Sequence, residues 1–241
     1  MTLAIRDFAS GAQADIALAG EIEQALRTAL RTRGRASMAV SGGSTPQRLY
    51  QRISRLQLDW SRVSVVLADE RWVDPGIAGS NETFIRENLL QGEAATARFY
   101  GLKTADPSPR DAAQTVSRKL LNCPLPFDVV VLGMGNDGHT LSWFPDATRL
   151  EAALERDGPL AAAITARPSA VTGPHTERLT LTRAALEQAN LVALLIHGEQ
   201  KRAVLEHARA PGPVSAMPIR ALIRDTALKL CVYSVPSPEK A

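Results

Sequence analysis

The chain has 241 residues, of which 45% are hydrophobic and 22% charged, and these values exclude a small disulfide-stapled module and a disordered chain. Lysines and arginines number 28 against 25 acidic residues, and because this small excess is spread along the chain we expect no nucleic-acid partner. Two cysteines are too few for a disulfide framework or a cysteine-rich zinc site. No signal-peptide pattern and no apolar run near the ~18 residues of a membrane span is present, so we expect a cytoplasmic protein with no membrane partner.

Short apolar runs alternate with helical patterns along the whole chain. We predict strands at residues 3–8, 36–41, 63–68, 127–133, 179–182, 191–197 and 227–234. Helices are predicted at residues 15–32, from Pro46, after Ser80-Asn81, at residues 110–121 and at residues 199–208, with loops and a short strand between residues 146 and 178. This alternation is typical of an α/β fold, an open, mostly parallel twisted sheet that is doubly wound with helices on both faces. No repeat or linker is visible, so we predict one domain over residues 1–241, with a possible small subdomain around residues 146–178.

The first segment that suggests chemistry is Ser41-Gly42-Gly43-Ser44-Thr45-Pro46, between a predicted strand and a predicted helix. Its glycines let backbone N–H groups approach an anion, its hydroxyl groups add donors, and the helix N-terminus adds positive potential. A tight strand-to-helix turn is the alternative interpretation. The two hydroxyl residues Ser44 and Thr45 and the proline at the helix start favour a phosphate site.

Charged residues follow one other predicted strand, precede another, or begin a helix. Asp69-Glu70-Arg71 comes after the strand at residues 63–68, where charge alone favours a solvated loop over a functional site. Arg178 precedes a strand and Lys201 begins a helix. Either cation can bind an anion, although each taken singly fits an ordinary surface position.

The segment Gly133-Met134-Gly135-Asn136-Asp137-Gly138-His139 directly follows the predicted strand at residues 127–133. Its G-x-G-x-x-G spacing suggests a dinucleotide-binding turn, which requires a long helix directly after the third glycine. Pro145 comes too early for that helix, and the segment lies in the middle of the chain, so we reject this interpretation. What remains is a flexible backbone that presents Asp137 and His139 two residues apart.

Histidine is the side chain best matched to proton transfer near neutral pH, and a neighbouring carboxylate can orient it. His139 is therefore the first catalytic candidate. We expect structural or surface roles for His175, His197 and His207. The chain contains no nucleophile elbow, no phosphate-binding P-loop and no zinc helix, and no histidine pair has metal-ligand spacing, so we expect no metal.

Taken together and in order, these segments resemble the 6-phosphogluconolactonase family. The resemblance spans nearly the full chain, and its most specific element is the G-M-G-x-D-G-H segment. The match also includes Ser80-Asn81, Thr140, Phe144-Pro145, Arg178-Leu179-Thr180-Leu181-Thr182 and Gly198-Glu199-Gln200-Lys201.

The resemblance implies hydrolysis of 6-phospho-D-glucono-1,5-lactone to 6-phospho-D-gluconate in the pentose phosphate pathway, without metal or organic cofactor. It also implies the α/β fold that these enzymes share with glucosamine-6-phosphate isomerases. His139 is expected to act as general acid and base, with Asp137 orienting it or the water. Arg71 is expected either to stabilise the oxyanion or to hold the phosphate. The phosphate is expected to contact Ser41, Gly42, Gly43, Ser44 and Thr45, together with Arg178 and Lys201, in a monomer or weak homo-oligomer.

Two alternative functions stay open. Glucosamine-6-phosphate isomerases share the first loop and the Asp-Gly-His element, but they typically carry Asn-Glu-Pro after the histidine, and that glutamate assists ring opening. Here the stretch reads Leu141-Ser142-Trp143-Phe144-Pro145, without a carboxylate, which favours the lactonase. Leu141 and Trp143 are mild departures from the Ala-Ser-Leu-Phe-Pro-like sequence that is usual in lactonases. The second alternative is a non-catalytic sugar-phosphate-binding protein, against which the retained Asp137 and His139 argue.

Overall fold

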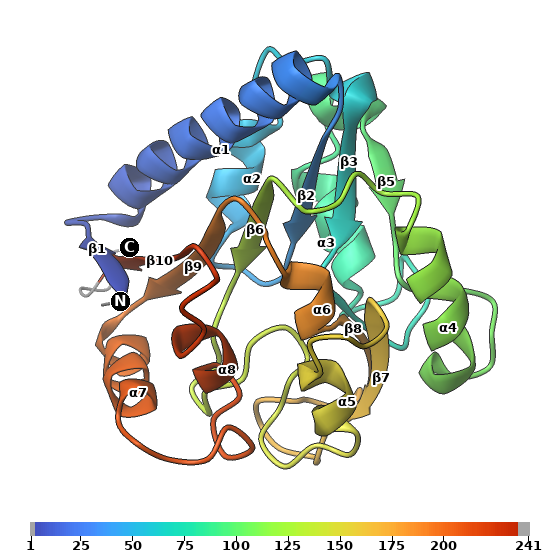
Figure 1. Ribbon diagram of the computed structural model, residues 1–241, viewed down its shortest axis with the longest axis vertical. Helices are drawn as coiled ribbons and strands as arrows, with labels where there is room; N and C mark the ends of the chain where they lie inside the picture. Colours follow the sequence, from blue (N-terminus) through green and yellow to red (C-terminus); the bar gives the residue numbers. More distant parts are fainter. Residues whose placement is uncertain (1–2, 236–241) are drawn as a thin grey trace.

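The computed structural model describes residues 3–235, and its central feature is a seven-stranded sheet (Figure 1). The strand order is β1-β10-β9-β6-β2-β3-β5, and all neighbouring strands are parallel. The bounds are β1 (Ala4–Asp7), β2 (Ala36–Val40), β3 (Val63–Leu67), β5 (Arg98–Tyr100), β6 (Val129–Leu132), β9 (Val192–His197) and β10 (Leu230–Val235).

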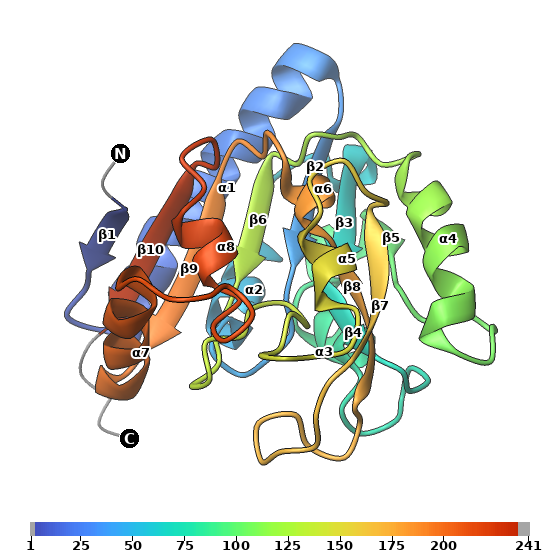
Figure 2. The ribbon, with the colours of Figure 1, turned by 60° about the horizontal axis from the view of Figure 1, so that its bottom comes forward.

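Helices cover both faces of this sheet. Figure 2 shows α1 behind the sheet and α8 in front of it, and α1 contacts β2, β6 and β10. Because both faces are covered, β2, β3 and β6 are buried along their whole length, and only Ser37 and Ser64 interrupt their apolar sequences. The predicted doubly wound α/β fold is confirmed. The helices are α1 (Gly11–Arg33), α2 (Gln47–Ile53), α3 (Asn81–Asn88), α4 (Pro109–Leu120), α5 (Leu150–Leu154), α6 (Arg183–Leu186), α7 (Glu199–Arg209) and α8 (Arg220–Ile223), with short 3₁₀ turns at Trp60–Arg62 and Gly92–Thr96.

The helix ends follow from local sequence. The Ser10 hydroxyl accepts the Gln13 N–H at the start of α1, and Gly34 ends that helix in a left-handed conformation with φ 71°. The Ser80 hydroxyl accepts the Thr83 N–H at the start of α3, as its position before Asn81 predicts. Pro46 is the cap residue of α2 rather than its first helical residue, so this helix begins one residue later than predicted.

A second, three-stranded antiparallel sheet has the order β4-β8-β7. Its strands are β4 (Asp69–Arg71), β8 (Glu177–Leu181) and β7 (Ala161–Thr165). Ala68 joins the two sheets, because its N–H donates to the Val40 carbonyl and its carbonyl accepts the Leu181 N–H, both at 2.8 Å. The strand predicted at residues 179–182 therefore exists, but it pairs in this second sheet and not in the parallel one.

The topology brings the segments that carry chemistry to one place. Strands β9, β6, β2 and β3 are consecutive neighbours in the parallel sheet. The segments that begin at Gly198, Gly133, Ser41 and Asp69 follow their carboxyl ends. In open α/β sheets, ligands bind beyond these ends. The single-domain organisation and the subdomain around residues 146–178 stay predictions.

Candidate active site

A cavity of about 460 Å³ opens beyond these strand ends. Most of the predicted site residues line it, while Asp137 and Arg178 are not among its lining residues. The predicted residues in its wall are Ser41, Gly42, Gly43, Ser44, Thr45, Arg71, His139 and Lys201, and the others are Pro46, Asp69, Asn81, Gly133, Met134, Gly135, Asn136, Leu141, Ala170 and Val171.

The turn that carries Asp137 and His139 is fixed by backbone hydrogen bonds. The Gly135 N–H donates to the His139 carbonyl at 2.9 Å, and the Ile219 N–H donates to the Gly138 carbonyl at 3.0 Å. Gly138 has φ 80°, a left-handed conformation that glycine adopts without steric cost. The turn is therefore held both by its own ends and by the segment at the start of α8.

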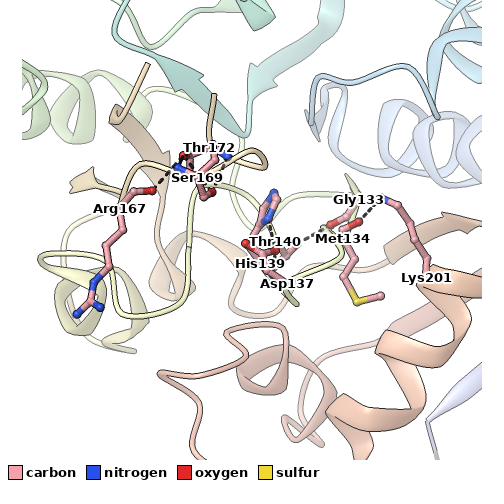
Figure 3. Close-up of polar contacts among 9 residues, drawn as sticks. All are labelled: Gly133, Met134, Asp137, His139, Thr140, Arg167, Ser169, Thr172 and Lys201. Atoms are coloured by element: carbon pink, nitrogen blue, oxygen red, sulfur yellow. Dashed lines mark hydrogen bonds and ion pairs between the residues drawn. The ribbon is translucent and has the colours of Figure 1, made fainter. Parts of the chain in front are cut away.

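Asp137 and His139 form a hydrogen-bonded pair within this turn (Figure 3). Nδ1 of His139 lies 2.6 Å from Oδ1 of Asp137, and the same oxygen accepts the His139 backbone N–H at 3.1 Å. Burial acts to raise the pKa of Asp137, but the hydrogen bonds and charge of His139 outweigh it and hold that pKa below its usual range. An ionised Asp137 that accepts a hydrogen bond from Nδ1–H leaves Nε2 as the basic nitrogen of the neutral His139 ring.

The first loop is positioned by α2 and α3. The Tyr50 hydroxyl donates to the Ser41 carbonyl at 2.7 Å and so ties the loop to α2. A Cβ at Gly42 would lie 2.0 Å from Oδ1 of Asn81, so only glycine permits this close approach. Gly43 has φ 101°, which also favours glycine. These two glycines explain why the loop can turn directly from β2 into α2 along the cavity wall.

Asp69 is buried, with 7% of its surface exposed, and not in the solvated loop that its charge suggested. Its Oδ2 accepts the Ser142 hydroxyl at 2.7 Å, and its carbonyl accepts the Asn81 side-chain amide at 2.9 Å. Both Asp69 and Asn81 line the cavity. Sequence reasoning assigned neither of them a role in the site, although the position of Asp69 just after the buried strand β3 was a usable signal.

Glu70 is fully buried and organises the start of α3. Its carboxylate accepts the N–H groups of Arg71, Asn81 and Glu82 at 2.8, 2.8 and 2.7 Å, and the Ser80 hydroxyl at 3.2 Å. Burial raises the pKa of Glu70 to about 6, against the opposing effect of these backbone bonds. The expectation of a solvated loop is therefore wrong for Glu70 too, because this carboxylate replaces water as the acceptor for four donors.

Arg71 and Arg178 lie directly opposite each other in the β4-β8 pair. Arg71 lines the cavity and donates to the Gly79 carbonyl at 2.5 Å. Arg178 is 2% exposed, and its guanidinium donates to the Thr172 carbonyl at 2.7 Å. Burial and the charge of Arg71 lower the pKa of Arg178 to about 10. Like charges directly opposite each other destabilise a sheet. An anion that bound beside Arg71 and Arg178 would offset the repulsion between their guanidinium groups.

Lys201 reaches the cavity from the first turn of α7. Its Nζ donates to the Met134 carbonyl, as Figure 3 shows. Burial lowers the pKa of Lys201, while the charge of Asp137 opposes that effect. The neighbouring Gln200 accepts a hydrogen bond from Asn136, another lining residue, at 3.1 Å. The beginning of α7 therefore supports the turn that holds the His139 pair.

The loop between β7 and β8 forms one further wall, which includes Ala170 and Val171. The Thr172 hydroxyl accepts the Ser169 N–H at 2.8 Å and donates to the Arg167 carbonyl at 3.0 Å (Figure 3). Sequence reasoning left this segment as an irregular loop. No residue pattern in it signals a contact with the cavity.

Comparison with known proteins identifies the family. The family model described as glucosamine-6-phosphate isomerases/6-phosphogluconolactonase matches residues 10–231. The chain belongs to this family. It is 44% identical to a 6-phosphogluconolactonase of Rhizobium meliloti over 220 residues, 91% of this chain and 93% of the relative. It is also 44% identical to a 6-phosphogluconolactonase of Pseudomonas aeruginosa over 215 residues, 89% of each chain.

Solved structures agree with this family assignment. A 6-phosphogluconolactonase from Shewanella baltica OS155 is similar with a TM-score of 0.91 and 42% identity, over 97% of each chain. A monomeric glucosamine-6-phosphate deaminase is similar with a TM-score of 0.77 and 14% identity, over 97% of each chain. The second likeness shows the shared fold alone.

The stretch that follows His139, from Leu141 to Pro145, contains no acidic residue. Leu141 lines the cavity with φ 50°, and Ser142 and Trp143 are fully buried. The Ser142 hydroxyl bonds to Asp69, and Nε1 of Trp143 donates to the Leu181 carbonyl at 3.0 Å. No carboxylate of this stretch is therefore available to the cavity.

The described residues contain no group of three or more His, Cys, Asp or Glu side chains that could hold a metal ion. Over residues 3–235, no helix is long and apolar enough to span a membrane. The absence of a cofactor stays a prediction.

Proposed function

We propose that the protein is a carboxylic ester hydrolase that converts 6-phospho-D-glucono-1,5-lactone to 6-phospho-D-gluconate, a step of the pentose phosphate pathway. The observation that carries this proposal is the His139–Asp137 pair at 2.6 Å beside a cavity that is also lined by hydrogen-bond donors and cations able to bind an anion. The relatives named 6-phosphogluconolactonase at 44% identity support the same substrate.

The reaction needs a base for water and an acid for the leaving oxygen. Nε2 of His139 takes a proton as the water oxygen attacks C1 of the lactone. When the bond between C1 and the ring oxygen breaks, the same nitrogen returns a proton to that oxygen. Asp137 holds Nδ1 throughout and stabilises the charged imidazole between the two steps. The immediate product is an open-chain carboxylic acid, which releases its proton to solvent and becomes the carboxylate.

The phosphate is held by the first loop and Lys201, which line the same cavity as His139. The loop presents backbone N–H groups and three hydroxyl groups without any acidic residue, which suits a dianion. Arg71, the last residue of β4, lines the cavity and serves either the phosphate or the oxyanion on C1. Arg178 contacts the phosphate if its guanidinium leaves the Thr172 carbonyl.

The alternative function, a glucosamine-6-phosphate isomerase or deaminase, is disfavoured by the stretch from Leu141 to Pro145. Ring opening in that reaction is assisted by a glutamate, and this stretch contains none. Its Ser142 and Trp143 side chains are buried. A non-catalytic sugar-phosphate-binding protein is disfavoured by the ordered His139–Asp137 pair. We further propose a cytoplasmic protein that acts without cofactor, as a monomer or weak homo-oligomer, with no nucleic-acid partner.

The test generates the lactone in situ from glucose 6-phosphate and its dehydrogenase. NADPH from 6-phosphogluconate dehydrogenase is then followed with and without this protein, and the unaided hydrolysis is subtracted. We expect a protein-dependent increase in rate. No increase with folded protein contradicts the proposal, and ammonia release from glucosamine 6-phosphate then distinguishes the isomerase or deaminase function from mere binding.

Removing a phosphate ligand should weaken substrate binding. For Thr45→Ala and Lys201→Ala we expect KM to rise by about tenfold with little change in kcat, since one charge-assisted hydrogen bond is lost. Initial rates in the coupled assay measure both constants. Lys229→Ala, which removes an exposed lysine at the opposite end of the sheet, is the control. An effect confined to kcat would contradict a phosphate-holding role.

The shape of the His139 turn depends on Gly135. A Cβ there would lie 2.1 Å from Nδ1 of His139 and 2.6 Å from Oδ1 of Asp137, so Gly135→Ala must push the pair apart. We expect kcat to fall by roughly tenfold or more, because part of the acid–base contribution is lost. Gly20→Ala is the control, since a Cβ at Gly20 meets nothing within 4 Å. Unchanged kcat in Gly135→Ala would show that the pair is not needed.

A further inference from the structure

A second hollow, of about 430 Å³, lies between α1 and α2. It shares no lining residue with the catalytic cavity. Its wall consists of Ala12, Asp15, Arg48, Gln51, Arg52, Arg55 and Leu56. Hollows of this size accommodate small molecules.

The charges in this hollow are unbalanced. Asp15 is its one carboxylate, 2% exposed, and lies 3.4 Å from Nε of Arg48. Arg52 and Arg55 are exposed, and neither has an ion pair or a side-chain hydrogen bond within residues 3–235. Two guanidinium groups are therefore available to a ligand beside a third whose charge Asp15 compensates.

The spacing of the arginines is costly without a ligand. Arg48, Arg52 and Arg55 lie on one face of α2 and the turn that follows it, while the opposite face of α2 is buried in the core. Like charges three or four residues apart destabilise a helix. The helix dipole favours a cation at Arg52, in the last turn of α2, and Asp15 lies beside Arg48, in the first turn. A bound anion would offset the repulsion that remains between Arg52 and Arg55.

We propose that this hollow binds a small molecule with a diphosphate group. Each open guanidinium can form a bidentate pair with one phosphate, and two adjacent phosphates match the two open guanidinium groups. Gln51 supplies an amide at the same wall, although its Nε2 already donates to Asn88 at 3.0 Å. The site is separate from the catalytic cavity and does not depend on the substrate of that cavity.

Inorganic pyrophosphate is the probe, and calorimetric titration at constant ionic strength is the measurement. The titration uses protein that carries Thr45→Ala and Lys201→Ala, so that binding in the catalytic cavity is suppressed. We expect one pyrophosphate per chain. Adding Arg52→Gln and Arg55→Gln should weaken binding by about tenfold or more, as expected for the loss of charge-assisted hydrogen bonds.

The matched control adds Arg31→Gln and Arg35→Gln, which remove the same charge from exposed positions at the end of α1. This control should bind pyrophosphate normally. Equal weakening in the control would show a general charge effect and overturn the proposal, as would the absence of binding to the parent variant. A protein with only Arg52→Gln and Arg55→Gln should keep the wild-type circular dichroism spectrum. The proposal would also be overturned if this folded protein bound pyrophosphate normally and lost that binding when Thr45→Ala and Lys201→Ala were added.

Discussion

Replacing His139 by alanine is expected to lower kcat by on the order of 10²-fold or more, because the reaction then lacks both its base and its acid. The 2.6 Å contact with Asp137 shows how the side chain is prepared for this role, with Nδ1 engaged and Nε2 left basic. Asp137→Asn should also lower kcat, since an amide does not stabilise the charged imidazole. The coupled assay with NADPH measures both variants.

His207→Ala is the matched control for His139→Ala. His207 is an exposed histidine on α7, away from the cavity lining. Its replacement should leave kcat and KM unchanged. Near-normal turnover in folded His139→Ala protein would remove the acid–base assignment. A comparable loss in His207→Ala would point to a general effect of histidine removal.

Replacing Glu70 by glutamine should lower the free energy of unfolding by on the order of 2 kcal/mol. The two side chains have nearly the same volume, but the carboxylate accepts four donors, and both of its oxygens are used. An amide must turn its NH₂ group toward some of those donors, whichever way it is oriented. Some buried N–H groups then lose their acceptor.

Urea unfolding and thermal denaturation measure this loss of stability. For a chain of this length the expected fall in Tm is roughly 4–8 °C. The control is Glu87→Gln, because Glu87 is exposed on α3, the same helix whose start Glu70 holds. If Glu70→Gln and Glu87→Gln have the same Tm, the buried carboxylate does not stabilise the start of α3.

The sequence predicts the parallel sheet well because its strands are buried on both faces. Such strands are almost entirely apolar, as β2, β3 and β6 illustrate, and the helices between them carry recognisable caps such as Ser80 and Gly34. The strands β4 and β5 have three residues each, too few for an alternation of apolar and polar residues to be recognised in the sequence. The short helices α5, α6 and α8 are unpredicted for the same reason, and the pairing of β8 with β4 depends on tertiary contacts that no local pattern contains.

Site residues can be predicted from the sequence where their residue types suggest a chemical role, such as anion binding or proton transfer. The first loop, His139 and Lys201 line the cavity as predicted, and their roles stay predictions. Glu70 and Asp69 show the limit of that reasoning, because a charged run looks the same in a sequence whether its acceptors face water or buried N–H groups. Ala170 and Val171 were not predicted, because small apolar residues in an irregular segment carry no distinctive pattern.

The direct opposition of Arg71 and Arg178 has a consequence for the kinetics of folding. These two residues are far apart in the chain, and the β4-β8 pair that joins them closes a long loop. Closing long loops costs entropy, and non-local strand pairs form slowly. The wall that carries Arg71 is therefore expected to assemble after the local helices, so that enzymatic activity returns more slowly than the helical signal when denaturant is diluted.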